Sequence, residues 1–207
     1  MIHVFIDPSV LLRFYSYSDD ALSEVEKITA LVKSNAIKLY VTEQIVDERA
    51  RNRDKQISES MKQLNQLTGP VQMPRFAEHH DAAKKYLAAM ETARSARKEL
   101  AAAVETEIAA GELRADKVIQ DLFEAATALP RTEEIIERAR LRRELGNPPG
   151  KRDSLGDQIN WETLLEQVPV GVDLHLVVRD GDYQGVSNDA PNFFLRGEWN
   201  FKKKAKL

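Results

Sequence analysis

The sequence contains no cysteine, and this single absence excludes several kinds of chemistry. Disulfide bonds, thiolate catalysis, and zinc or iron–sulfur sites with cysteine ligands are all ruled out. Long apolar runs are missing too, because no segment approaches the roughly 20 residues that a helix needs to cross a bilayer. The first residues lack the basic start and the apolar stretch of a secretory signal. We therefore expect a cytoplasmic protein that does not enter a membrane.

Neither sign of charge dominates, because 30 Lys and Arg residues oppose 33 Asp and Glu residues and leave a net charge of −3. That balance argues against a protein that coats nucleic acid through its overall charge. Basic residues gather instead at residues 138–152 and in the C-terminal FKKKAKL, which is typical of a solvated tail. The first of these stretches leads directly into Asp157, and we expect its basic residues to contact phosphates. The expected contacts are Arg138, Arg142, Arg143, Lys151 and Arg152.

Short apolar runs alternate with helical patterns at both ends of the chain. Alternation of strands with helices favours a parallel α/β sheet. Helices are predicted from about 19 to 34, 42 to 66 and 154 to 166, the last after the turn NPPG. Strands are predicted at 2–6, 37–41 and 173–178, with a last edge strand around 192–196.

The middle of the chain follows a different pattern. Residues 76–146 are rich in Ala, Glu, Lys and Arg and predict helices at about 77–109, 115–128 and 131–146, with no strand. We therefore expect one domain over residues 1–207, in which a helical insertion at 70–148 interrupts the α/β pattern. The helical stretch lacks a sustained a/d heptad, and so a coiled-coil pairing arm is the weaker alternative.

Four acidic residues from distant segments stand where strands end or helices begin: Asp7, Glu48, Asp157 and Asp180. The carboxyl ends of parallel strands share one edge of a sheet, and so these side chains can meet there. Clustered carboxylates repel one another, and a divalent cation such as Mg²⁺ or Mn²⁺ relieves that repulsion. The pattern therefore predicts a metal site suited to cleaving a phosphodiester.

Glu48 is one of three acids in VTEQIVDERARNR, and its position on the expected helix separates it from the others. It lies three residues after Ile45 and so shares the face that carries the buried stripe. Glu43 and Asp47 face water, where they favour the positive start of the helix. The structural alternative for Glu48 is an ion pair with Arg51, three residues further on.

The other three acids also have structural alternatives. Asp7 follows its strand directly and can cap the turn that comes next. Asp180 and Asp182 lie in the turn RDGDY, where aspartates are common without any function. Asp157 occupies the first turn of a helix that is apolar on more than one side, and a buried carboxylate there needs a metal or the helix start as its partner. Asp153 precedes that helix and is the weaker candidate for the same role.

The order of these motifs resembles the PIN domain, a family of small α/β metal-dependent nucleases. The opening IHVFIDPSVLL is similar to the first strand and aspartate of the family, with Asp7 in place. The family continues with a glutamate on the helix after the second strand, which corresponds here to Glu48. Its later acids are matched by Asp157 in GDQINWETLL and by Asp180 in VVRDGDY, with Asp182 as a supporting acid.

The resemblance covers about residues 1–55 and 150–185, and it departs from the family pattern at Pro8 and Val178, where hydroxyl residues are usual. It implies a three-layer parallel α/β sheet with helices on both faces. It also implies that the four acids are catalytic and, with the supporting Asp182, hold one or two Mg²⁺ or Mn²⁺ ions.

The activity implied by the resemblance is endonucleolytic cleavage of RNA, with Ser9 orienting a metal-bound water beside the nucleic acid. A DNA-directed nuclease of the flap-endonuclease type is an alternative, because contacts to the 2′-hydroxyl leave no mark in this sequence. Another alternative is a catalytically silent binding or scaffold module, whose partner surface would be the helical segment. The sequence also leaves a homodimer and an antitoxin-like inhibitor open as partners.

Overall fold

The computed structural model describes residues 1–16, 22–69, 72–150, 153–179, 181–187 and 190–207. The elements follow one another in this order: β1 (Ile2–Ile6), α1 (Pro8–Leu12), the 3-10 helix η1 (Arg13–Tyr15), α2 (Leu22–Lys33), β2 (Ile37–Thr42), α3 (Glu43–Gln66), α4 (Asp81–Ala110), α5 (Arg114–Ala125), β3 (Thr127–Leu129), α6 (Glu133–Glu144), α7 (Gly156–Gln167), β4 (Leu174–Val177), the 3-10 helix η2 (Gly181–Tyr183) and α8 (Phe193–Lys203).

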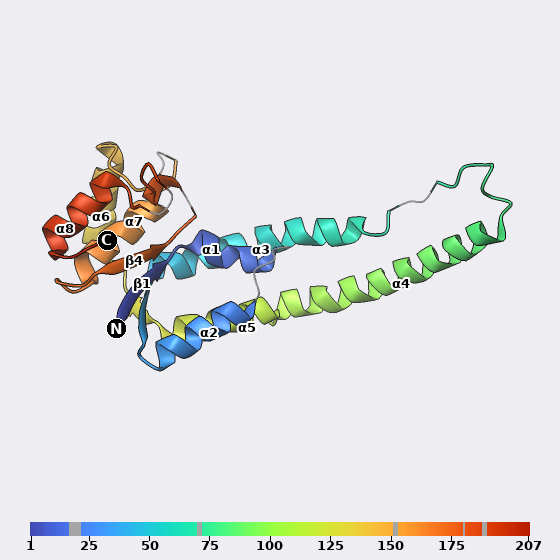
Figure 1. The fold of residues 1–207 in the computed structure, drawn as a ribbon, viewed down its shortest axis with the longest axis horizontal. Coiled ribbons are helices and arrows are strands. Elements are labelled where there is room, and N and C mark those ends of the chain that lie inside the picture. Colours follow the sequence, from blue (N-terminus) through green and yellow to red (C-terminus); the bar gives the residue numbers. More distant parts are fainter. Residues whose placement is uncertain (17–21, 70–71, 151–152, 180, 188–189) are drawn as a thin grey trace.

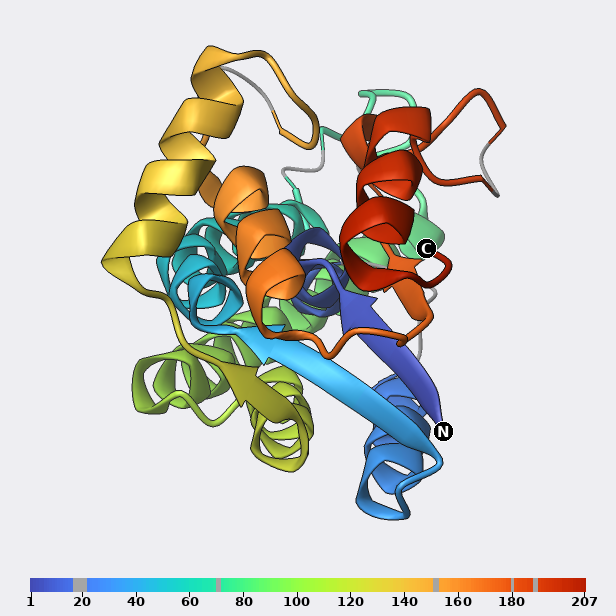
Figure 2. The same ribbon diagram turned by 90° about the vertical axis from the view of Figure 1, so that its left-hand side faces the viewer.

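The four strands form one parallel sheet in the order β3-β2-β1-β4. Phe5 of β1 lies opposite Tyr40 of β2 and Leu176 of β4, so the central strands stay in register across the sheet. Helices α6, α7 and α8 lie on one face of the sheet, and α2 and α5 lie on the other (Figure 2). The central strands are nearly continuous apolar runs because both faces are covered. The predicted three-layer α/β fold is thus confirmed.

Helix α7 lies inside this body and is buried along most of its length. Nine of its 12 residues are buried, among them Trp161 and Leu164. Trp161 packs against Trp199 of α8, with 5.7 Å between the ring centroids. A helix surrounded on several sides carries apolar residues around most of its circumference, and so its sequence has no single apolar stripe.

The other prominent feature is a helical hairpin that projects from the body (Figure 1). The chain leaves along the 24-residue helix α3 and returns along the 30-residue helix α4. The two helices are joined by side-chain contacts: Arg97 Nε donates to Thr68 Oγ1 at 2.8 Å, and Arg94 donates to the carbonyl of Gly69 at 3.1 Å. We call residues 62–103 the arm. No helix in the described part of the chain is long and apolar enough to span a membrane.

Two sequence predictions about strands are wrong. Residues 76–146 were expected to contain no strand, yet β3 pairs with β2 and extends the sheet by one strand. It has only three residues, which is too short to give a period of two. The edge strand expected around 192–196 is the beginning of α8 instead, where Asn192 caps the helix by accepting from Phe194 N. The buried residues of α8 are Leu195, Trp199 and Lys203, a spacing of four that belongs to a helix.

Candidate functional site

Asp7 lies at the carboxyl edge of the sheet, where β1 and β4 end together. Its backbone N donates to the carbonyl of Val177, at the end of β4, over 2.9 Å. The carboxylate is buried and caps α1 by accepting from Ser9 N at 2.9 Å and from Ser9 Oγ at 2.5 Å. Pro8 occupies the first helical position, where its fixed φ suits a helix start. The turn after β1 therefore fixes the carboxylate at the sheet edge, and the expected cap is present.

Glu48 is half-buried in the second turn of α3, which begins directly after β2 with Thr42 as its cap. Burial raises the pKa of Glu48, and the negative charge of Asp7 raises the pKa further. A hydrogen bond from Gln44 and the charge of Arg51 act in the opposite direction. Like charges that disfavour each other's ionised form must lie close together. Asp7 and Glu48 are therefore close enough for the charge of one to affect the pKa of the other.

Gly156 brings the start of α7 to the same region. A Cβ on this residue would lie 3.0 Å from Glu48 Oε2 and 3.2 Å from Gln44 Nε2, and so a larger residue would push these two side chains away from α7 by a few tenths of an ångström. Asp157 follows Gly156 in the first turn of α7. The positive end of a helix N-terminus favours nearby carboxylates. The start of α7 therefore faces Glu48, while β1 and α3 bring Asp7 alongside.

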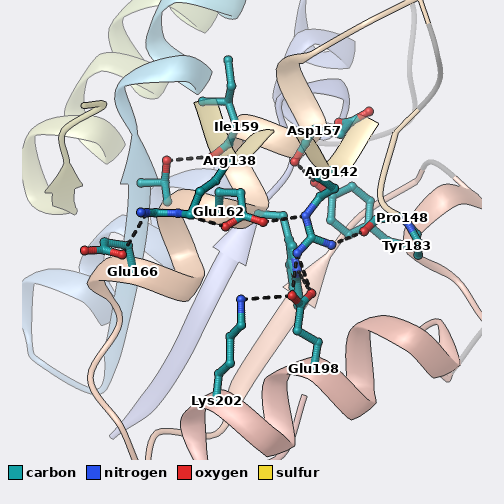
Figure 3. A network of polar contacts seen from close by, with 12 residues as sticks. Arg138, Arg142, Pro148, Asp157, Ile159, Glu162, Glu166, Tyr183, Glu198 and Lys202 are labelled. Atoms are coloured by element: carbon teal, nitrogen blue, oxygen red, sulfur yellow. Dashed lines mark hydrogen bonds and ion pairs between the residues drawn. The ribbon is translucent and has the colours of Figure 1, made fainter. Parts of the chain in front are cut away.

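Of the last two predicted acids, the structure describes only Asp182. Asp180 lies outside the described residues. Asp182 is partly buried within η2. The next residue, Tyr183, is buried and its hydroxyl donates to the carbonyl of Asp157 at 3.5 Å (Figure 3). That contact ties η2, which carries Asp182, to the first turn of α7.

A group of three or more His, Cys, Asp or Glu side chains arranged to hold a metal ion is absent from the described residues, which do not include Asp180. The donors that the described part does bring together are carboxylate oxygens, the ligand type that Mg²⁺ and Mn²⁺ prefer. Burial and, after it, the charge of Asp7 raise the pKa of Glu48, and a nearby divalent cation would favour the ionised carboxylate. The chemistry of these residues therefore fits such a cation.

Arg142 has a role that the sequence did not reveal. It is only 4% exposed, and its guanidinium binds Glu162 of α7 and Glu198 of α8, each at 2.6 Å (Figure 3). It also donates to the carbonyl of Pro148 at 2.6 Å, and Trp161 Nε1 donates to Glu198 at 2.8 Å. The expected phosphate contact by Arg142 is therefore wrong, because its donors are used inside the protein to join α6, α7 and α8.

The other basic residues of this stretch differ in exposure. Arg138 lies at the edge of the same network, paired with Glu166 at 2.8 Å and with Glu162 at 3.4 Å. Arg143 is partly exposed. Lys151 and Arg152 lie outside the described residues. The phosphate contacts expected of these four residues stay predictions.

The structure adds two residues to the site that sequence reasoning missed. Asn160 is fully buried one turn after Asp157, and its Oδ1 accepts from Thr42 Oγ1 at 2.5 Å. This bond joins α7 to the start of α3, on which Glu48 lies. Gln44 hydrogen-bonds to Glu48 and lies against Gly156. Asn160 lies three residues after Asp157 and so on the same face of the helix, and this spacing could have indicated Asn160 from the sequence.

Comparisons with known proteins agree with this geometry. A family model described as PIN domain matches residues 4–183, a span that reaches from β1 to η2 and includes the segments of all the predicted acids. No curated protein and no solved structure gives a significant match to the chain. Proteins with this domain have a nuclease-like fold and typically use divalent metals. Because the match covers most of the sequence, the chain belongs to the PIN-domain family.

Proposed function

We propose that the protein is a metal-dependent endoribonuclease whose catalytic acids are Asp7, Glu48, Asp157 and Asp180, with Asp182 in support. The observation that carries the proposal is the raised pKa of Glu48, caused by burial and by the charge of Asp7, at the carboxyl edge of a PIN-domain sheet. Carboxylates whose pKa values are shifted by like charge are typical of functional sites.

The chain's own residues prepare this site in three ways. Ser9 donates to Asp7 through both its backbone N and its hydroxyl, which fixes the carboxylate in one orientation. Gly156 lets the positive end of α7 approach Glu48, and this favours negative charge there. A bound Mg²⁺ or Mn²⁺ ion would activate water and offset charge on the phosphate. Glu48, whose pKa is raised in the absence of metal, would give up its proton more readily beside that positive charge.

The proposed substrate is single-stranded RNA. Arg51 supports a nucleic-acid substrate, because it is exposed one turn beyond Glu48 on α3 and can contact a phosphate that enters the site. Arg138, Arg143, Lys151 and Arg152 are proposed as further phosphate contacts. Phosphate contacts do not distinguish RNA from DNA, and so the experiment below compares the cleavage of both polymers.

The test is cleavage of a single-stranded RNA and of a DNA with the same sequence, in Mn²⁺ or in EDTA. We expect Mn²⁺-dependent cleavage of the RNA that Asp7→Asn abolishes. The matched control is Asp54→Asn, because Asp54 is a strongly exposed acid on α3 that pairs with its neighbour Arg53. Cleavage of the DNA alone would mean that the substrate is DNA and not RNA. Full activity of Asp7→Asn would show that Asp7 is not a catalytic acid and would overturn the proposed site.

A second candidate is a PIN-fold scaffold without catalytic activity, whose partner surface is the arm. It is supported by the absence of a three-acid metal group from the ranges that the structure describes. Thermal unfolding distinguishes the two, because an ion that binds only the folded state raises its melting temperature. The nuclease should melt at a higher temperature in Mn²⁺, whereas a scaffold without a metal site should show no change. An inhibitor protein or a second copy of the chain would be the partner in the scaffold case.

A further inference from the structure

Helix α8 has two unlike faces. One is built into the body, where Trp199 is fully buried against Trp161. The other leaves two phenylalanines in solvent, with Phe193 81% exposed and Phe201 74% exposed. Single apolar residues on a surface are common, but two large aromatics on one helix face form a patch that calls for an explanation.

Phe193, Gly197 and Phe201 follow one another at intervals of four and therefore form a single column on this face. The two aromatic residues are eight positions apart, which is about 12 Å along the helix axis. A Cβ at Gly197 would meet nothing within 4 Å, and so no packing inside the chain requires glycine there. Glycine inside a helix costs roughly 1 kcal/mol relative to alanine. The gap between the two rings is thus left open at a cost in stability.

Beside the Phe193 end of this column lies a depression of about 390 Å³, bounded by α8 and by the C-terminal residues 205–207. Its lining includes Phe193, Gly197 and Asn200 but not Phe201. A depression of this size next to the exposed Phe193 ring can take a flat group such as a nucleobase, stacked on an aromatic face.

Cations accompany the aromatic column. The Arg196 guanidinium lies 5.5 Å from the centre of the Phe193 ring, and Lys204 Nζ lies 4.9 Å from the centre of the Phe201 ring. Arg196 and Lys204 have no ion pair with a carboxylate in the part of the chain that the structure describes. Glu198, on the same helix, is held on the other side by Arg142 and Lys202. The exposed face of α8 therefore combines free positive charge with stacking surfaces.

We propose that this face of α8 binds single-stranded nucleic acid, with bases stacked on Phe193 and Phe201 and phosphates held by Arg196 and Lys204. A polyanion is favoured over an apolar protein partner because an apolar partner would bury these cations without a counter-charge. The proposal deepens the proposed function by giving the nuclease a second point of contact with its substrate, but the binding itself needs no metal. It should tolerate different sequences, because stacking does not read base edges.

The test measures binding of a fluorescent single-stranded oligonucleotide of 12 ribonucleotides by anisotropy, in EDTA so that no cleavage occurs. The Phe193→Ala/Phe201→Ala double variant should bind at least tenfold more weakly than the wild type. Phe76→Ala is the matched control, because Phe76 is 83% exposed near the tip of the helical hairpin, and it should bind as the wild type does. Arg196→Ala should lower the dependence of binding on salt.

Gly197→Ala sharpens the test because two effects of opposite sign are expected. The added methyl group should stabilise α8 and raise the melting temperature, while filling the gap should weaken oligonucleotide binding several-fold. Equal binding by the wild type and the double variant would overturn the proposal. If, in addition, sedimentation shows that the double variant changes its oligomeric state, the aromatic face contacts a second copy of the chain instead. Loss of cleavage in Asp7→Asn with unchanged oligonucleotide binding would support a binding face separate from the catalytic acids. A wild type that binds the oligonucleotide but never cleaves RNA would overturn the proposed nuclease activity and leave the proposed binding face standing.

Discussion

Helices α7 and α4 show two ways in which a sequence specifies a helix. Nine of the 12 residues of α7 are buried, whereas only two of the 30 residues of α4 are buried, and both are alanines. In α7 tertiary contacts determine almost every position, and buried polar residues have specific partners: Asn160 accepts from Thr42 of the neighbouring segment, and Thr163 donates to the Ile159 carbonyl of α7 itself. In α4 the helix depends on residues of high intrinsic propensity, and most side chains face water. Changes in α7 should therefore affect the whole fold, and changes in the part of α4 that belongs to the arm only the arm.

The largest expected effect comes from the ion network that surrounds α7. Arg142→Met removes the buried guanidinium from Glu162 and Glu198, which keep the more exposed partners Arg138 and Lys202, and this should cost about 3 kcal/mol of unfolding free energy. Arg140→Met is the matched control on the same helix, because Arg140 makes only an exposed pair with Glu137, worth at most about 1 kcal/mol. Urea unfolding followed by tryptophan fluorescence measures both. Equal stability of the two variants would show that the buried network contributes nothing.

The comparison itself is tested by the same substitution in each helix. Leu164→Ala in α7 removes a fully buried side chain and should cost about 2–5 kcal/mol. Leu87→Ala in α4 removes a side chain that is 45% exposed and should cost less than about 0.5 kcal/mol. Urea unfolding at several protein concentrations gives both values. A cost at Leu87 similar to that at Leu164, and dependent on concentration, would mean that the arm is buried against a second copy of the chain.

The same contrast explains what the sequence could predict. The central strands were predicted to within a residue or two because their apolar runs end at clear signals such as Asp7-Pro8, and α4 was predicted because high helix propensity is a local property. Strand β3 was missed because its three residues form a strand only by pairing with β2, a contact distant in sequence. Helix α8 was mistaken for a strand because its start, NFFLR, reads as a short apolar run and its buried positions become clear only over three turns.

The sequence proposed individual acids for the site, and their roles as metal ligands stay predictions, but it did not reveal the groups around them. Asp7 and Glu48 were proposed from their places after a strand and on a helix face. In the structure, burial and then the charge of Asp7 raise the pKa of Glu48. The role of Gly156 depends on a close approach of α7 to α3, which no local pattern encodes. Arg142 was taken for a phosphate contact because a run of basic residues gives no sign of which member points inward.

Asp116 of α5 tests how a buried carboxylate behaves when it is fully partnered. It accepts from Tyr15, Arg49 and Arg53 at distances between 2.6 and 3.1 Å. Burial alone would raise the pKa of Asp116, but the hydrogen bonds from Arg53 and Tyr15 and the charges of both arginines outweigh it, and the pKa is lowered. Burial and the hydrogen bond to Asp116 raise the pKa of Tyr15 to about 12, so Tyr15 keeps its proton at neutral pH.

A lowered carboxyl pKa contributes stability that is present above the unfolded value and is lost as pH falls through the folded value. Asp116→Asn should therefore cost about 2–3 kcal/mol at pH 7, because hydrogen bonds to a charged group are weakened. The difference from the wild type should shrink below about pH 4, where the unfolded carboxyl gains its proton. Urea unfolding between pH 3 and 7 measures the difference in unfolding free energy between Asp116→Asn and the wild type. A cost that stays constant over this range would contradict the assigned charge.

The smallest expected change has the opposite sign and lies in the candidate site. The pKa of Glu48 is raised by burial and by Asp7, and so its contribution to stability is full below its unfolded value of 4.5 and is lost as pH rises through the folded value. At pH 7 without metal, ionised Glu48 should make the protein less stable than Glu48→Gln, and this difference should vanish near pH 4. Mn²⁺ should then stabilise the wild type and leave Glu48→Gln nearly unchanged, because the ion relieves a repulsion that the amide lacks. Thermal unfolding at pH 4 and 7, with and without Mn²⁺, measures all of these differences. A Gln variant that is less stable than the wild type at pH 7 without metal would mean that Glu48 is a partnered structural acid like Asp116, and the site would lose its second carboxylate.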